Sequence, residues 1–229
     1  TDSLFVKVKK GDIKKAARAF LEKMNKKLPG ILELELQGIY KKGLFVPQKL
    51  GTYTAKKRYA LLDEKGGFVV RGMEAVRRDW CDIAKNLQRD VLRLVLEDKE
   101  KEAVRRVREA VKRIKQRKVE IKDISMRTML GKSLDEYKAK GPHVIVARKL
   151  EKEGHEVPPG TVLSFVITKG KGSISDRAEP VNKVSVNDYD IEYYLNNQII
   201  SVAMRVLRVL GYKEEDFIEG SLDKFVKNK

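Results

Sequence analysis

The sequence begins Thr1-Asp2-Ser3-Leu4-Phe5-Val6, in which a carboxylate directly precedes a short apolar run typical of a β-strand. An acidic side chain in this position is either solvated at a frayed end or held at a turn where it binds a metal ion. Composition alone favours the solvated alternative. The residues that follow decide between these two roles of the carboxylate.

The composition limits the class of protein. With 229 residues the chain can form one large domain or two small ones, and 41% hydrophobic residues exclude a disordered tail. Fifty basic residues against thirty-three acidic ones give a formal net charge of +17. This excess indicates a polyanionic partner, either nucleic acid or an acidic membrane surface. Thermophilic origin would explain the high charged content but not the imbalance.

Membrane insertion, export and cysteine chemistry find no support. The sequence has no apolar run of about 18 residues that could span a membrane, and no signal peptide at its start. We therefore expect a cytoplasmic protein with no membrane partner. The single cysteine, Cys81, excludes an internal disulfide and a cysteine zinc site, and is expected to be a packing residue.

The stretch after the opening residues predicts one helix and several strands. Asp12 can cap a helix that ends near Leu28, before Pro29-Gly30. Residues 31–37 alternate apolar and polar side chains with a period of two, which predicts a half-buried strand. Three more runs have the composition of strands: residues 43–46, 58–62 and 68–70.

From Glu74 onward the pattern becomes mainly helical. Apolar residues recur at helical spacing up to Leu94, and after a break near Asp98 they recur again up to Ile114. The basic residues within 105–118 lie outside this apolar stripe, which favours a solvated helix face over a DNA contact. A strand is expected at 161–168 and a last helix at about 190–210. The predicted fold class is α+β: a partial antiparallel sheet with one helix, followed by a mainly helical part with a small β element.

Several basic and aromatic motifs then follow at characteristic distances. They are Lys56-Lys57-Arg58-Tyr59, Arg71-Gly72-Met73-Glu74, Arg77-Arg78-Asp79-Trp80, the Lys169-Gly170-Lys171-Gly172 segment that ends in Asp176-Arg177-Ala178, and residues 190–199. Together they resemble the C-terminal part of a B-family DNA polymerase, most like the archaeal replicative enzymes. The resemblance implies a C-terminal part of the palm at residues 1–66, a thumb at 67–216 and a tail at 217–229. It also marks residues 47–54 as an insertion.

In that family a hairpin carries Asp-Thr-Asp-Ser or Asp-Thr-Asp-Gly, and its second Asp binds the catalytic metals. Asp2 matches this residue. Nucleotidyl transfer uses two divalent ions about 4 Å apart, here expected to be Mg²⁺. The resemblance therefore implies that Asp2 is catalytic and a metal ligand, with Glu35 as a supporting carboxylate. Gln37 replaces the third acid of close relatives, and Glu33 and Glu35 can equally form the solvated face of a sheet.

The resemblance also implies a set of DNA-binding residues. Lys57 would donate to the minor groove, where acceptors lie in nearly the same place for every base pair, and Tyr59 would pack beside the primer sugar. His143 can contact a phosphate or make a structural hydrogen bond. The whole set is Lys56, Lys57, Arg58, Tyr59, Arg71, Arg77, Arg78, Lys132, His143, Lys169, Lys171 and Arg177.

Other parts of the polymerase family have no counterpart in this sequence: the strand with the other principal metal ligand, the nucleotide-binding helix and the proofreading exonuclease. The implied partners are a large polymerase chain that carries these parts and shares the Mg²⁺ site, primer–template DNA and dNTP. Inteins commonly interrupt archaeal relatives at the point where this sequence starts, and Thr1 suits the splicing reaction. A natural subunit, an intein-derived half and a fragment all fit. A hydrolase with Thr1 as nucleophile has no other support.

The last residues contain a possible binding motif. Leu222 and Phe225 have the spacing of a sliding-clamp peptide of the PIP-box kind, with Glu219 in place of the usual Gln and Val226 in place of the second aromatic residue. The alternative is an amphipathic tail that docks on the thumb.

For the whole chain, the alternatives are a non-catalytic duplex-binding subunit and a ribonucleoprotein module, although no RRM or KH signature is present.

Overall fold

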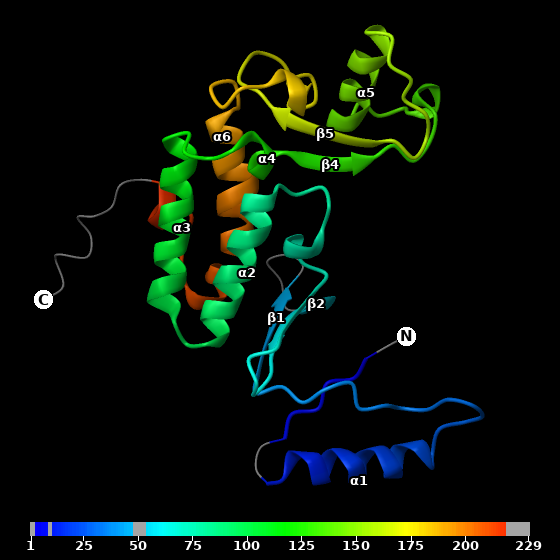
Figure 1. Ribbon diagram of the computed structural model, residues 1–229. Helices are drawn as coiled ribbons and strands as arrows, with labels where there is room; N and C mark the ends of the chain where they lie inside the picture. The colour runs from blue at the N-terminus through cyan, green and yellow to red at the C-terminus, as the bar shows by residue number, and fades with distance from the viewer. Residues whose placement is uncertain (1–2, 9–10, 48–53, 219–229) are drawn as a thin grey trace, which may run out of the picture.

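The computed structural model describes residues 3–8, 11–47 and 54–218. The predicted catalytic residue Asp2, the tail residues Leu222 and Phe225, and most of the 47–54 insertion lie outside the described residues. The fold class is α+β, as predicted. Within the described chain, two antiparallel three-stranded sheets, with strand orders β1-β2-β3 and β4-β5-β6, are joined by helices (Figure 1).

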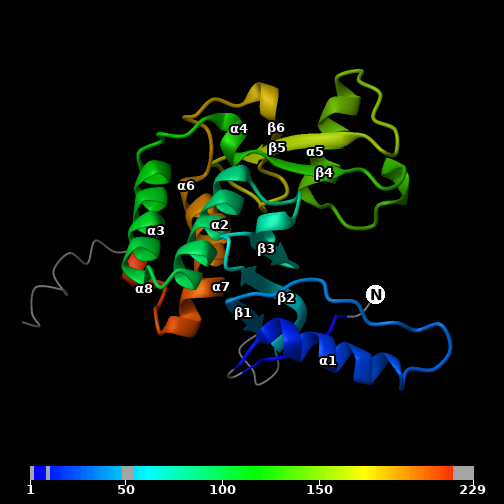
Figure 2. The same ribbon diagram turned by 60° about the horizontal axis from the view of Figure 1, so that its bottom comes forward.

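The leading part consists of an extended segment and helix α1 (Ile13–Asn25). Asp12 caps the helix as predicted, because its carboxylate accepts hydrogen bonds from the backbone N–H groups of Lys14 and Lys15. No residue of α1 is buried. Figures 1 and 2 show this helix below the first sheet, away from α2 and α3.

The predicted strand at residues 31–37 is wrong. The segment has no strand pairing, and Leu32 and Leu36 are exposed rather than half-buried. It is fastened to the helix instead, because the Asn25 side chain donates to the Leu34 carbonyl and accepts from the Leu34 N–H. A period-two pattern becomes a strand only beside a second strand, and none of the described residues provides one here.

The three later strands of this part are confirmed. Strand β1 (Lys42–Pro47) pairs with β2 (Thr54–Leu62), which pairs with β3 (Phe68–Arg71), all antiparallel. The β1–β2 register shifts between Phe45 and Pro47, so β2 contains a bulge. The rings of Phe45 and Tyr59 contact Phe5 edge-on, which anchors the leading segment to the sheet.

Two long helices form the centre of the remaining fold. Helix α2 (Asp82–Leu96) and helix α3 (Glu100–Lys115) carry the two predicted apolar stripes, and Asp98 between them has a left-handed φ of 62°. The expected start at Glu74 is wrong. Residues Glu74–Val76 form a single 3₁₀ turn and α2 begins only at Asp82. The Gln88 side chain accepts a hydrogen bond from the Ala75 N–H and so satisfies a buried backbone donor of this turn.

The second sheet projects from the upper end of these helices (Figure 1). Strand β5 (Val162–Ile167) confirms the predicted strand, and it lies between β4 (Met126–Met129) and β6 (Ala178–Pro180). The shorter helices of this region are α4 (Ile121–Ile124) and α5 (Pro142–Lys152), of which α5 packs on β5 and β6.

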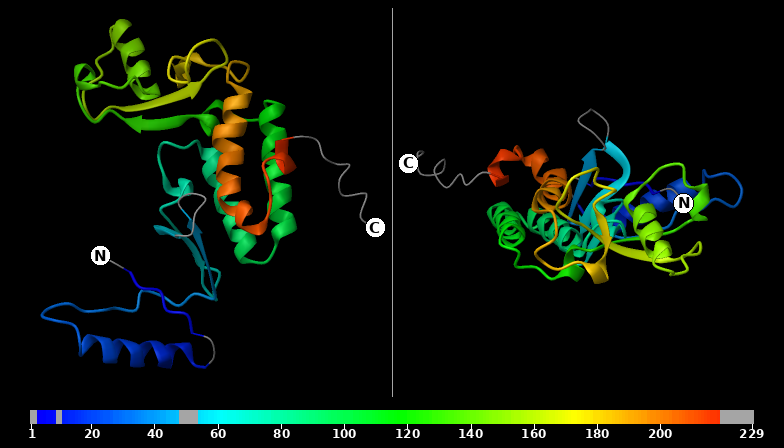
Figure 3. Two further views of the ribbon diagram at one scale, coloured as in Figure 1. Left: turned by 180° about the vertical axis from the view of Figure 1, so that it is seen from behind. Right: turned by 90° about the horizontal axis from the view of Figure 1, so that it is seen from above.

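The predicted last helix is present but not uniform. It starts as α6 (Ile191–Tyr193), continues as a π-helical segment (Tyr194–Ile200), becomes α7 (Ser201–Leu207) and ends in a 3₁₀ turn (Arg208–Leu210), followed by α8 (Glu215–Ile218). Seen from behind, this run stands against α2 and α3 (Figure 3). None of the helices in the described ranges has the length and apolar character needed to cross a membrane.

Candidate nucleic-acid interface

Three predicted DNA-binding residues meet on the first sheet. Tyr59 on β2 lies directly across from Arg71 on β3, and Lys57 stands two residues before Tyr59 on the same strand. Lys57 and Arg71 are exposed, whereas the Tyr59 ring packs against Phe5 and Phe45. Lys56 belongs to the same strand, but its side chain lies outside the described part.

The Lys57 backbone has an unusual conformation. Its φ is 66°, in the left-handed region that non-glycine residues seldom adopt. Gly72, with φ 63°, packs against it so closely that a Cβ on Gly72 would stand 2.0 Å from the Lys57 carbonyl oxygen. Lys57 lies in the stretch where the β1–β2 register is irregular, and the glycine leaves room for this turn of the backbone.

Arg58 has an internal partner. Its Nη2 donates to Glu74 Oε1 at 2.8 Å, and only 15% of its side chain is exposed. Burial alone would raise the pKa of the Glu74 carboxyl. The Gln88 hydrogen bond and the charges of Arg58 and Arg205 outweigh that effect and lower it. The guanidinium of Arg58 thus stabilises a buried carboxylate, and a DNA contact by Arg58 stays an untested prediction.

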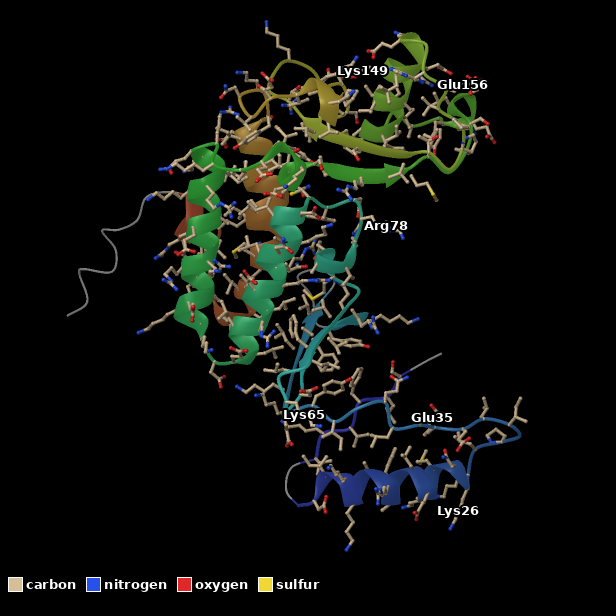
Figure 4. The ribbon with its side chains drawn as sticks, viewed as in Figure 1. Lys26, Glu35, Lys65, Arg78, Lys149 and Glu156 are labelled. Carbon is tan, nitrogen blue, oxygen red and sulfur yellow. The ribbon has the colours of Figure 1, made fainter. Side chains whose placement is uncertain are left out.

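Arg77 and Arg78 lie in the loop before α2, and both are exposed. Arg77 Nε donates to Asp79 Oδ1 at 2.9 Å, within an ion pair that partly neutralises its charge. Among the described residues no acid pairs with Arg78. Figure 4 shows Arg78 on the side of the molecule toward which α1 and the β4–β5 strands both extend. Of the two arginines, Arg78 therefore has its full charge available to a phosphate.

Lys132 and His143 are brought together by Tyr137. The Lys132 Nζ lies 5.0 Å from the centroid of the Tyr137 ring, and the His143 ring meets the same ring edge-on at 5.6 Å. The Tyr137 hydroxyl accepts a hydrogen bond from the Gly131 N–H at 2.8 Å. Burial lowers the pKa of His143, so its imidazole is neutral near pH 7 and offers a hydrogen bond rather than a charge.

The remaining predicted residues lie in the loop after β5, and they differ in exposure. Lys169 and Lys171 are exposed, next to Gly170 and Gly172. Arg177 points inward: it forms an ion pair with Asp190 and donates to the Thr168 carbonyl, and 16% of its side chain is exposed. Like Arg58, it has a structural partner, and its DNA contact stays a prediction.

The described residues do not form a metal site by themselves. Glu35 is exposed and supplies carboxylate oxygens, the ligand type that Mg²⁺ prefers. Within the described ranges, however, no three His, Cys, Asp or Glu side chains gather closely enough to hold a metal ion. A magnesium site that includes Glu35 would need carboxylates from outside the described residues.

Sequence reasoning missed the buried polar residues behind the loop. Glu74, Gln88 and Gln198 are buried among apolar residues and hold the backbone of residues 74–81. The only signal for them was a polar side chain within an otherwise apolar stripe, as at Gln88. Their partners lie too far along the chain for spacing to reveal them.

Comparison with known proteins identifies a family that matches most of this chain. The family described as DNA polymerase family B matches residues 1–210. The chain is 42% identical over 222 residues to a DNA polymerase of Thermococcus kodakarensis and 41% identical to one of Thermococcus gorgonarius. In each case 94% of this chain is covered. A DNA polymerase of Methanocaldococcus jannaschii is 39% identical over 226 residues.

A solved structure of the same family is also similar to this chain. The structure of the family B DNA polymerase from Pyrobaculum calidifontis covers 86% of this chain at 34% identity, with a TM-score of 0.66. This chain spans only part of each of these proteins: 13% of the Thermococcus kodakarensis protein, 28% of the Thermococcus gorgonarius protein and 25% of the Pyrobaculum calidifontis chain.

Proposed function

Since this chain belongs to DNA polymerase family B, we propose that it is the C-terminal part of the palm, at residues 1–66, together with the thumb, at residues 67–216. In this role it supplies one catalytic carboxylate, Asp2, and holds the primer–template duplex during template-directed DNA synthesis. The substrates of the assembled enzyme are primer–template DNA and dNTP.

One observation carries the duplex-holding role. Lys57, Arg71 and Arg78 are exposed at the junction between the first sheet and α2, on motifs that come from three separate segments. Lys57 is held there in a strained conformation against Gly72. A strained backbone at an exposed lysine is unexpected for a solvated surface, and it suits a residue that must reach a fixed place in a groove.

A second observation supports a partner for the palm part. In the leading segment and after α1, several large apolar side chains are exposed, among them Leu4, Val6, Leu32 and Leu36. Several large apolar side chains left exposed in one part of the chain favour a surface that another element covers. We propose that the covering element is the remaining palm sheet, carried by the large chain that also bears the fingers and exonuclease.

In the assembled site, Asp2 would act as a metal ligand and Glu35 as a supporting carboxylate. Bound Mg²⁺ ions supply activation of the primer hydroxyl and stabilisation of the leaving pyrophosphate. The residues of this chain orient the duplex. Lys57 faces the minor groove, and Arg71 and Arg78 hold the backbone near the primer end.

Salt dependence of duplex binding tests the duplex-holding role. If the chain alone contacts about five phosphates, log K should fall against log salt with a slope of about −4 to −5. Changing Arg77 and Arg78 to glutamine should make this slope shallower by up to about two, with Arg78→Gln giving the larger share because Asp79 partly neutralises Arg77. Fluorescence anisotropy at several salt concentrations measures the slope.

Arg105→Gln is the matched control. Arg105 is as exposed as the loop arginines but lies on α3, where it pairs with Glu102 and Glu109. Its substitution should leave the slope unchanged. If the double substitution at Arg77 and Arg78 also leaves the slope unchanged, these arginines do not contact the backbone, and the duplex-holding role loses their support.

The tail offers a separate test. Residues 219–229 lie outside the described residues, and we propose that Leu222 and Phe225 bind a sliding clamp. With Glu219 and Val226 in place of stronger contacts, the peptide alone should bind with tens of micromolar affinity or weaker, roughly 6 kcal/mol. Tethering on shared DNA would raise the effective concentration enough to compensate. Deleting 219–229 should abolish clamp stimulation of extension on long primed templates.

Two other outcomes of the tail deletion are informative. Clamp stimulation at full strength after deletion would show that the tail is not the clamp motif. A collapse of activity without the clamp would show that the tail is part of the thumb fold, which is the alternative role for Leu222 and Phe225.

A further inference from the structure

A buried carboxylate, Glu74, joins the strand that carries Lys57 to the helices behind it. Only 3% of its side chain is exposed. Arg58 Nη2 from β2 donates to Glu74 Oε1 at 2.8 Å, and Gln88 Nε2 from α2 donates to Oε2 at 2.9 Å. From α7, Arg205 Nε lies 3.5 Å from Oε1. One carboxylate therefore contacts a sheet strand and two helices at once.

The loop that follows Glu74 is fixed at both ends by buried amide side chains. Gln88 Oε1 accepts the Ala75 N–H at 2.7 Å, and Gln198 Oε1 accepts the Cys81 N–H at 3.3 Å. Both glutamines are buried, and Gln198 belongs to the π-helical segment. The exposed arginine pair lies between these two bonds, and the first of them comes from Gln88, which also contacts Glu74.

The network is sensitive to the loss of a single charge. Glu74 is ionised at neutral pH and faces two guanidinium groups, those of Arg58 and Arg205. Removing one member of a buried ion pair leaves the other charge without compensation. Because Arg58 directly follows Lys57 in the strand, a change at Glu74 reaches the Lys57 backbone through one peptide unit.

We propose that Glu74 is a positioning residue for duplex binding. It holds the Lys57 strand and the Arg77–Arg78 loop in one fixed arrangement, so that the groove contact and the phosphate contacts engage the same duplex together. This inference rests on the proposed function, because both sets of residues are taken to face DNA. Glu74 itself does not touch the duplex; it acts through Arg58 on one side and through the backbone of its own loop on the other.

The test compares the effect of Lys57→Ala on duplex binding in two backgrounds. In the wild-type chain, Lys57→Ala should weaken duplex binding by about tenfold at fixed salt, the size expected for one charge-assisted contact. Glu74→Gln keeps the side-chain size and removes the charge. In that background, binding should already be weaker, and adding Lys57→Ala should have no further effect. If Glu74 has only a structural role, Glu74→Gln should lower the melting temperature. The factor by which Lys57→Ala weakens duplex binding should then be the same in both backgrounds.

Glu214→Gln is the matched control, because Glu214 is an exposed acid that forms an ion pair with Arg208 at 2.9 Å. In this control, Lys57→Ala should keep its full effect. Far-UV circular dichroism checks folding of each variant. If Glu74→Gln does not fold, Arg58→Lys takes its place, since lysine keeps the positive charge and loses the guanidinium that reaches the carboxylate.

Each outcome decides a separate point. An equal Lys57→Ala ratio in the wild-type chain and in a folded Glu74→Gln chain overturns the positioning role and leaves the proposed function intact. No effect of Lys57→Ala in the wild-type chain removes Lys57 from the duplex contact, and the positioning role falls with it. No duplex binding by the wild-type chain overturns the proposed function itself.

Discussion

Replacing Asp2 by alanine is expected to abolish primer extension by the assembled polymerase while duplex binding by the chain stays nearly unchanged. A carboxylate that holds catalytic metal ions stabilises the transition state and adds little to DNA affinity, so its loss should appear in the rate of nucleotide addition. Single-turnover extension of a labelled primer measures that rate, and anisotropy with the same duplex measures affinity.

Asp12→Ala provides a control for this substitution. Asp12 is another acid of the leading part, and its observed role is to cap α1. Its loss should cost roughly 1 kcal/mol of stability and leave extension close to that of the wild type. If Asp2→Ala retains extension within a few-fold of the wild-type rate, Asp2 is not part of the active site, and the catalytic part of the proposed function is wrong.

Replacing Gly72, which directly follows β3, by alanine is expected to cause a large loss of stability. The new Cβ would stand 2.0 Å from the Lys57 carbonyl oxygen, and the residue would have to keep a φ of 63°. The obstacle is backbone rather than a flexible side chain, so β2 must move. We expect a loss of about 3 kcal/mol in the free energy of unfolding, measured by chemical denaturation, and weaker duplex binding.

Gly211→Ala separates the two causes of this loss. Gly211 has a φ of 91°, but a Cβ there would meet no atom within 4 Å. Its substitution should therefore cost only the backbone strain, about 1–2 kcal/mol. If Gly72→Ala lowers the free energy of unfolding no more than Gly211→Ala does, the close contact between Gly72 and Lys57 does not constrain the strand. The structure then gives no reason to regard the position of Lys57 as fixed.

The sequence was sufficient for elements whose signals are local. Asp12 and Pro29-Gly30 bracket α1, and the two apolar stripes before and after Asp98 correspond to α2 and α3. In each case the side chains that stabilise the element lie within a few residues of one another, so spacing alone carries the information. The α+β class followed from the same local patterns.

The rest depends on contacts between distant parts of the chain. Residues 31–37 have the period of a strand but no described neighbour to pair with. The loop before α2 is held by Gln198, 117 residues away from Cys81. Neither the missing partner strand nor the Gln198–Cys81 hydrogen bond can be recognised in the local sequence pattern. For this reason a strand was predicted where none forms, and the start of α2 was placed too early.

The candidate site shows the same division. The motifs predicted a group of DNA-binding cations, but they could not distinguish cations that face solvent from those that face acids. Arg58 and Arg177 stand in basic motifs beside exposed lysines, yet their partners Glu74 and Asp190 are 16 and 13 residues farther along the chain. Only the fold determines that these two guanidinium groups point inward.

The most direct test of the account is template-directed incorporation of labelled dNTP by this chain, by the chain that carries the remaining palm, fingers and exonuclease, and by the two together, in the presence of Mg²⁺. The account predicts duplex binding but no incorporation by this chain alone, and incorporation only when both chains are mixed. Incorporation by this chain alone would contradict its role as one part of the active site, and so would incorporation by the large chain at the same rate with and without it.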